Sequence, residues 1–305
     1  MGTTNFTGLT INGVPVQAGG GSLPMTTGDV YFVDSGTGVT GNNGTSKASA
    51  IPTIDEAHNK CTASQGDIIV VMEGHAENIA SATSLVLDTA GVTIIGLGRG
   101  RNRPTLTFTA TASRIPISAD DVYMSNFLLD ASIASIVSGV TITGDDVTLD
   151  NIEWNFDATG IEFLQMLDID ACSRAVIQNC QFVAENIAGT NTGIRFDTAA
   201  YMVLRNNIFR GDFTTAAISG TTGSAAASTD VLIDGNLIEN KDTTAGLLLD
   251  VHDTGTGIVA NNRGFTLFAT APETAFDTGN ALACENYVVN AVDESGLIIP
   301  ELLST

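Results

Sequence analysis

A short stretch that ends in asparagine recurs along this chain of 305 residues and limits what it can fold into. In six copies, the positions two and four before the asparagine are mostly apolar: Val122–Asn126, Val147–Asn151, Ala175–Asn179, Met202–Asn206, Gly257–Asn261 and Leu282–Asn286. A seventh copy, Val231–Gly235, has glycine in place of asparagine, and Asn236 follows it. Successive copies are 25 to 29 residues apart by subtraction. One strand-like unit per period of this length indicates a solenoid.

The alternation within each copy indicates which kind of solenoid forms. Apolar residues two positions apart follow the period of a β-strand, so one face of each strand can be buried. A second apolar residue comes three positions after six of these seven bends: Leu129, Trp154, Phe182, Phe209, Ile238 and Val289. Each turn of the solenoid is therefore expected to contain two or three short strands that meet at a bend.

Asparagine suits such a bend because it tolerates the left-handed backbone region, and glycine enters that region without a steric penalty. Side-chain amides that are stacked on successive turns can also hydrogen bond to one another. The sequence therefore predicts an internal asparagine ladder made of Asn126, Asn151, Asn179, Asn206, Asn236, Asn261 and Asn286.

These features resemble right-handed, single-stranded parallel β-helix proteins of the pectate-lyase-like class. The resemblance covers roughly residues 29–290 and is strongest in the opening segment, at Tyr31–Asp34, Asn43–Ser46 and Gly66–Val71. It implies an all-β solenoid. It implies little about function, because this fold carries lyases, hydrolases, adhesins and inert spikes.

Composition narrows the choice of partners. The formal net charge is −22, from 12 basic and 34 acidic residues, so the surface should repel nucleic acid and no nucleic-acid partner is expected. No apolar run is long enough for a transmembrane helix, and no secretory signal is evident at the N-terminus, so we expect synthesis in a host cytoplasm and no membrane partner. In a virus particle, the same acidity favours a position outside the shell.

Three segments are expected: an arm with a Gly-rich hinge at 1–22, the β-helix at 23–290, and a C-terminal cap or subunit contact at 291–305. Asn12-Gly13 is a hairpin signal within the arm. The arm resembles N-terminal segments of phage structural proteins, which attach a distal domain to the particle. The attachment residues are then Phe6, Leu9, Ile11, Val14, Pro15 and Val16. The alternative is that the arm packs on its own β-helix as a lid.

One helix is expected at 49–62, capped by Ser49 or Thr53, where it would cover the open N-terminal end of the solenoid. His58 is expected on its solvated face. A loop that carries Arg99, Arg101 and Arg103 follows, and we expect these arginines to pair with acidic residues of a neighbouring coil or subunit, with binding of an acidic sugar as the alternative.

The four cysteines show no metal spacing, and no metal or cofactor is expected. Cys180 and Cys284 fall beside ladder positions and are interpreted as small buried residues. A disulfide between Cys172 and Cys180 stays open, although nothing in the sequence favours one.

Catalysis on this fold would need paired carboxylates or a basic residue that acts on polysaccharide. Asp120-Asp121 and Asp145-Asp146 are acidic pairs at equivalent places in successive coils, which indicates turn chemistry rather than an active site. No catalytic residue is therefore assigned.

The expected function is architectural. The chain is predicted to be a non-enzymatic capsid decoration or head spike on the exterior of a tailed-phage particle, bound to the major capsid protein or another virion protein through its arm. The resemblance implies a homotrimer, and 264–280 and 291–305 supply spare apolar surface. Weak glycan contact is also expected. The alternatives are a tailspike-type enzyme that degrades polysaccharide and a glycan-binding adhesin.

Overall fold

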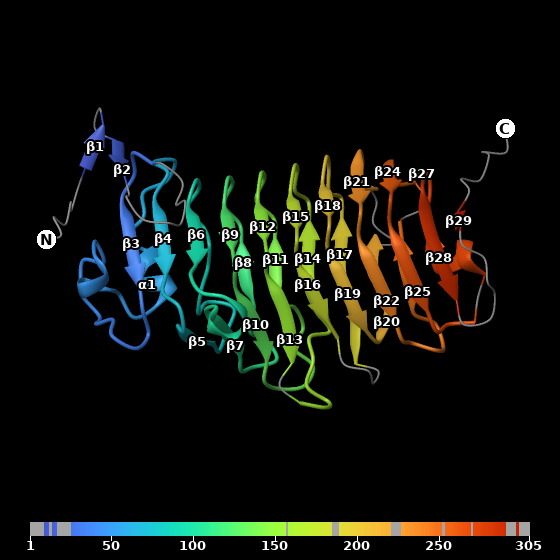
Figure 1. Cartoon of the computed structure of the whole chain (residues 1–305), viewed down its shortest axis with the longest axis horizontal. Coiled ribbons are helices and arrows are strands. Elements are labelled where there is room, and N and C mark those ends of the chain that lie inside the picture. Colours follow the sequence, from blue (N-terminus) through green and yellow to red (C-terminus); the bar gives the residue numbers. More distant parts are fainter. Residues whose placement is uncertain are drawn as a thin grey trace, which may run out of the picture.

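The chain forms an all-β parallel solenoid in which three sheets run along a rod (Figure 1). The computed structural model describes residues 9–11, 14–16, 26–156, 158–184, 189–220, 227–251, 254–269, 271–290 and 297–298. Successive coils follow one another from one end of the rod to the other, as the colour order shows (Figure 1).

Each coil contributes in turn to three sheets. Sheet 1 contains β3 (Val30–Val33), β4 (Ile68–Val71), β6 (Thr93–Gly96), β9 (Tyr123–Ser125), β12 (Thr148–Asp150), β15 (Val176–Gln178), β18 (Val203–Arg205), β21 (Val231–Asp234), β24 (Gly257–Ala260) and β27 (Leu282–Cys284). Sheet 2 contains β5 (Ala76–Ile79), β7 (Thr105–Phe108), β10 (Leu128–Ala131), β13 (Glu153–Phe156), β16 (Gln181–Val183), β19 (Ile208–Gly211), β22 (Leu237–Asn240), β25 (Arg263–Thr266), β28 (Asn286–Asn290) and β29 (Leu297–Ile298). Sheet 3 contains β8 (Ile115–Ile117), β11 (Val140–Ile142), β14 (Gln165–Asp170), β17 (Thr190–Asp197), β20 (Phe213–Gly220), β23 (Leu247–Asp250) and β26 (Phe276–Asp277).

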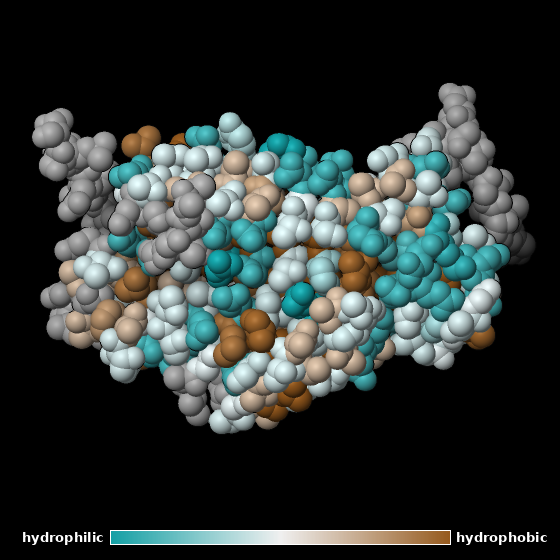
Figure 2. Space-filling view, turned by 180° about the vertical axis from the view of Figure 1, so that it is seen from behind, coloured by the Kyte–Doolittle hydropathy of each residue, from teal (hydrophilic) through white to brown (hydrophobic). Residues whose placement is uncertain are grey.

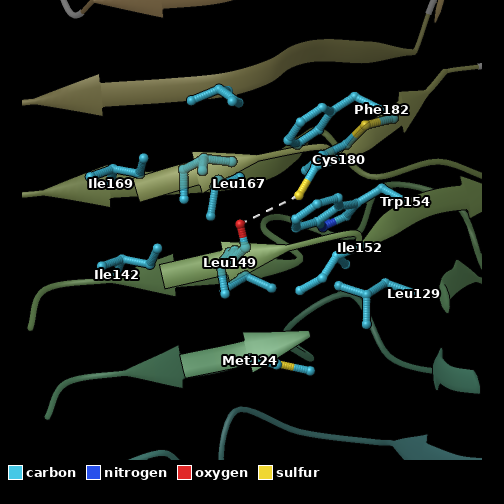
Figure 3. Close-up of a cluster of buried hydrophobic side chains, with 14 of the residues drawn as sticks. Met124, Leu129, Ile142, Leu149, Ile152, Trp154, Leu167, Ile169, Cys180 and Phe182 are labelled. Atoms are coloured by element: carbon cyan, nitrogen blue, oxygen red, sulfur yellow. Dashed lines mark hydrogen bonds between the residues drawn. The ribbon is translucent and has the colours of Figure 1, made fainter. Parts of the chain in front are cut away.

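The core lies inside the coils and is built from columns of side chains in register. Parallel pairing places Trp154 beside Phe182 and Phe182 beside Phe209. Their rings stack at centroid distances of 4.5 and 4.6 Å, which matches the spacing of neighbouring strands. Figure 3 shows Trp154 and Phe182 beside Leu149 and Leu167, which project into the same interior from the other two sheets.

At the N-terminal end, Gly44 and Ile51 hydrogen bond to the open edge of β3, on either side of the 3-10 turn η1 (Lys47–Ser49). The short helix α1 (Ile54–His58) follows and contacts β3 and β4, so the structure does not place it over the end of the solenoid as predicted. The hydroxyl of Thr53 accepts the backbone N–H of Glu56 at 3.2 Å and caps α1. The helix predicted at 49–62 was therefore too long, because Ile51 already forms a parallel bridge with Val33. The prediction for His58 was wrong, since its side chain is only 2% exposed.

Two further elements lie near the ends of the chain. Strands β1 (Leu9–Ile11) and β2 (Val14–Val16) pair antiparallel in a two-stranded sheet of their own. Near the C-terminus, α2 (Pro272–Ala275) precedes β26, and β29 pairs antiparallel with β28. The face in Figure 2 is largely hydrophilic to neutral, with hydrophobic patches between. Within the described residues, no helix is long and apolar enough to cross a bilayer.

Candidate functional site

The predicted attachment arm is a hairpin. Leu9 pairs with Val16 and Ile11 with Val14. Asn12-Gly13, where the turn was predicted, lies outside the described residues. The hairpin belongs to none of the three solenoid sheets. Phe6 lies outside the described residues. Attachment through this arm stays a prediction.

The predicted asparagines occupy two columns rather than one ladder. Those at the bend between sheets 1 and 2 have φ of 53° to 66°, in the left-handed region: Asn126, Asn151, Asn179, Asn206 and Asn261. Most of this column is exposed. The Nδ2 group of Asn151 donates to Oδ1 of Asn126 at 2.8 Å, whereas Asn179 and Asn261 donate to Asp150 and Asp234. Gly235 takes the same bend position with φ of 66°.

The second column lies one residue after each bend and is buried. It contains Asn207, Asn236, Asn262 and Asn286. In each step, the Oδ1 atom of the next asparagine accepts the backbone N–H of the one before it, at 2.9 to 3.0 Å. The prediction placed Asn286 at the bend, but Glu285 lies there with φ of 54°. Asn207 and Asn262 were missed, although the doublets Asn206-Asn207 and Asn261-Asn262 signal both columns.

The acidic pairs build turns, as the sequence indicated. Asp121 and Asp146 both have positive φ, and Oδ1 of Asp120 accepts the backbone N–H of Asp145 at 2.8 Å. The guanidinium of Arg174 donates to Asp146 at 2.6 Å, and this bond lowers the pKa of the Asp146 carboxyl.

The arginine loop borders a hollow on the outer face of sheet 2. Buried Arg103 forms an ion pair with Glu153 and donates to the carbonyl of Asn151 at 3.3 Å. It therefore pairs with an acidic residue as predicted, but two coils further along the solenoid instead of in the neighbouring coil. Arg99 and Arg101, beside and within η2 (Gly100–Asn102), are exposed. The hollow has a volume of about 180 Å³, and its polar lining comprises Arg101, Arg103, Asp130, Glu153 and Asn155.

A Ser, His and Glu group near α1 has the composition of a catalytic triad but a different geometry. His75 Nδ1 accepts the backbone N–H of Ser35 at 3.0 Å, and His75 Nε2 lies 3.1 Å from Glu77. The Ser35 hydroxyl accepts from the backbone N–H of Ala76 instead of contacting the imidazole. Glu77 also accepts the first N–H of α1, from Ile54, at 3.0 Å. These contacts fix the helix to the solenoid.

Two carboxyl groups meet at the corner between sheets 2 and 3. Burial raises the pKa of Asp212, and the neighbouring Asp242 raises it further. Burial alone would raise the pKa of Asp242. The backbone N–H groups of Ala245, Gly246 and Thr244 donate hydrogen bonds to its carboxylate, and together they outweigh burial and lower the pKa of Asp242. Within the described part of the chain, Oδ1 of Asp212 has no hydrogen-bond partner. This corner can hold a proton between the two carboxyls.

All four cysteines are free. Burial raises the pKa of Cys180 to about 12 and that of Cys172 to about 11. Cys180 is buried as predicted, and its sulfur lies 3.7 Å from the carbonyl of Leu149 (Figure 3). Cys284 is exposed, so that prediction was wrong. The described residues include no group of three or more His, Cys, Asp or Glu side chains placed to hold a metal ion.

The outer face of sheet 2 becomes apolar in the last coils. Leu237, Phe265, Tyr287 and Val289 are 39 to 50% exposed. Val289 had been predicted to be buried, but the shifted bend at Glu285 puts Val288 inside instead. A hollow of about 320 Å³ lies on this face, between Arg210, Leu237, Glu239, Arg263 and Phe265, with Ile238 and Gly264 beneath.

The parallel β-solenoid is similar to pectate lyase and phage tailspike structures. No protein-family model matches the chain, and no curated protein gives a significant match. PfbA, a surface adhesin of Streptococcus pneumoniae, matches 79% of this chain and 76% of its own, with a TM-score of 0.48 and 12% identity. Pectate lyase Pel9A matches 87% and 80%, with a TM-score of 0.47 and 12% identity. The enzymatically active domain of bacteriophage CBA120 tailspike protein 2 matches 76% and 37%, with a TM-score of 0.40 and 16% identity. Because these TM-scores are at most 0.48 and the identities at most 16%, none of the activities of these proteins is assigned to this chain.

Proposed function

We propose that the chain is a structural protein on the exterior of a tailed-phage particle, a capsid decoration or head spike that its N-terminal hairpin attaches. The observation that carries this proposal is the separate sheet formed by β1 and β2. A hairpin of two strands is at best marginally stable in water and leaves strand edges open to a partner. Strand addition to such an edge is a common mode of attachment.

The partner in this proposal is the major capsid protein or another virion protein. The solenoid then projects from the shell, and its net charge of −22 keeps it away from packaged nucleic acid. Leu9 and Ile11 alternate with Thr10 along β1, so they share one face of the strand and Thr10 lies on the other.

This alternation supplies a matched test. The double variant Leu9→Asp/Ile11→Asp should lose at least about tenfold in co-sedimentation with particles of the encoding phage, because each charge must be desolvated at the contact. Thr10→Asp adds a charge to the opposite face and should keep binding. Equal binding by the double variant and the unchanged protein would show that the hairpin is not the anchor. Far-UV circular dichroism of each variant checks that the solenoid is intact.

A second candidate is a tailspike-type enzyme or adhesin that acts on polysaccharide. The hollow beside Arg101 and Arg103 favours it, because Asp130 and Glu153 lie diagonally on neighbouring strands at the same opening. Release of new reducing ends from host polysaccharide, abolished by Glu153→Gln, would support the enzyme. Saturable glycan binding without cleavage would support the adhesin.

A further inference from the structure

The hollow on the last coils of sheet 2 has an apolar floor. Leu237 and Phe265 line it, and their side chains are 42% and 39% exposed. On the next strand, Tyr287 and Val289 extend the apolar surface and are 50% and 42% exposed. The volume of about 320 Å³ lies at the lower end of the range for ligand pockets, so the hollow suits one large apolar group.

Two arginines flank this floor. Arg210 lies on β19 and Arg263 on β25, and strand β22 runs between them. In register, Arg210 is next to Glu239 and Arg263 is next to Leu237, so the two arginines occupy opposite corners. Two strand spacings and two residues along a strand place their Cα atoms about 12 Å apart. Both arginines line the hollow, so a group that packs on Leu237 lies between them.

The hollow is positively charged in an acidic protein. Arg210 and Arg263 are exposed, and within the described residues neither guanidinium has an ion pair or a hydrogen bond. Glu239, the acidic residue of the lining, forms an ion pair with Lys241 at 3.6 Å instead of with Arg210. Two arginines and one lysine against one glutamate leave a local net charge of +2, whereas the whole chain carries −22. Such a site favours a ligand that supplies carboxylates.

The lining favours a peptide over a sugar. A sugar presents hydroxyl groups on several sides, but the lining that the structure describes offers one carboxylate, that of Glu239, which already pairs with Lys241. Aromatic residues and arginine are instead enriched at surfaces that bind proteins. Large apolar side chains that are exposed together, like those around this hollow, also mark such surfaces.

We propose that this hollow binds a peptide segment of a partner protein in which a large apolar side chain is flanked by carboxylates. The apolar side chain packs on Leu237 and Phe265. The flanking carboxylates accept hydrogen bonds from Arg210 and Arg263, which the rest of the described chain leaves unpaired. The site lies apart from the N-terminal hairpin and from the arginine loop, so it does not depend on either of the functions proposed above.

The probe for this site is a pentapeptide, blocked at both ends, in which two glutamates stand on each side of one phenylalanine. Saturation-transfer NMR titration of the full chain should show saturable binding at physiological ionic strength. A peptide with alanine in place of phenylalanine lacks the apolar group, and one with glutamines in place of the glutamates lacks the charges. Each should bind at least about fivefold more weakly.

The variants test the site itself. Arg210→Gln/Arg263→Gln should weaken binding of the glutamate peptide at least about fivefold and remove its advantage over the glutamine peptide. Arg114→Gln is the matched control, because Arg114 is exposed in an early coil and should leave binding unchanged. All three arginines are exposed, so the unfolding midpoints should stay close to that of the unchanged protein.

Several results would overturn the proposal. These are no binding of the glutamate peptide, equal binding of the three peptides, and undiminished binding by Arg210→Gln/Arg263→Gln. An oligomer of uronic acid that binds more tightly than the peptide, and loses binding in the same variant, would assign the hollow to a sugar instead.

Discussion

Asn236 Oδ1 accepts two hydrogen bonds from Asn207, one from its backbone N–H at 2.9 Å and one from its Nδ2 group at 3.1 Å. Asn236 Nδ2 in turn donates to the carbonyl of Leu204 at 3.0 Å and to Oδ1 of Asn262 at 2.9 Å. The side chain of Asn236 therefore links three successive coils by hydrogen bonds, and both of its buried polar groups have partners.

Asn236→Ala should therefore strongly destabilise the solenoid. The substitution leaves the amide groups of Asn207 and the carbonyl of Leu204 buried without this partner, and the expected loss in free energy of unfolding is about 2–4 kcal/mol. Denaturant unfolding followed by circular dichroism measures it. Asn261→Gly is the control, because glycine suits the positive φ at this exposed bend, and its effect should stay below about 1 kcal/mol. Equal effects of the two substitutions would contradict the two-column description.

His58 should make stability depend on pH. Burial lowers the pKa of His58 below its usual 6.5, and the nearby Asp88 and Asp55 only partly oppose this. The unfolded chain then binds a proton that the folded chain does not, so this contribution is fully present above about pH 6.5 and is lost as the pH falls below it. The melting temperature should fall between pH 7.5 and 5.5, and less so in His58→Leu. An equal fall in both proteins would exclude His58 as the cause.

Asp212 should have the opposite effect. Because burial and Asp242 raise the pKa of Asp212 above its usual 3.8, its contribution to stability is fully present below that value and is lost as the pH rises through the raised pKa. Asp212→Asn keeps the shape, removes the charge and can donate to Asp242. We expect the variant to melt at a higher temperature than the unchanged protein at pH 7, with a smaller difference at pH 4. A variant that is less stable at pH 7 would contradict this.

The reactivity of cysteine tests the register of the last coil. In the folded protein, the exposed Cys284 should be the one thiol that a maleimide labels rapidly at pH 8. Burial raises the pKa of Cys61 to about 12, and Cys172 and Cys180 are also protected by burial. Cys284→Ser should remove the rapid phase. Rapid labelling of a second thiol, or of none, would show that the coil is placed differently.

The sequence predicted the solenoid well because the positions two and four before each bend are apolar in every copy from Val122 to Asn206. It failed by one residue at Leu282–Asn286, since asparagine suits both the exposed bend and the buried position after it. This shift of one residue reversed the faces of the strands on which Cys284 and Val289 were expected to lie, because neighbouring residues of a strand face opposite ways.

The exposed apolar side chains of the last coils could not be predicted for a related reason. Leu282 and Tyr287 lie on strands of alternating pattern, and hydrophobicity alone does not say which side of such a strand faces the core. Likewise, nothing local reveals that His58 is buried, because residues distant in the sequence, such as Asp88, surround it. The arm hairpin was predicted from Asn12-Gly13 because a tight turn is encoded within a few residues.

The account depends most on attachment through the hairpin. The most direct measurement is co-sedimentation of the encoding phage's particles with the full chain and with a chain that lacks residues 1–22. The full chain should bind saturably, and the truncated chain should keep the circular dichroism of the solenoid but stay in the supernatant. Undiminished binding of the truncated chain would show that the hairpin is not the anchor.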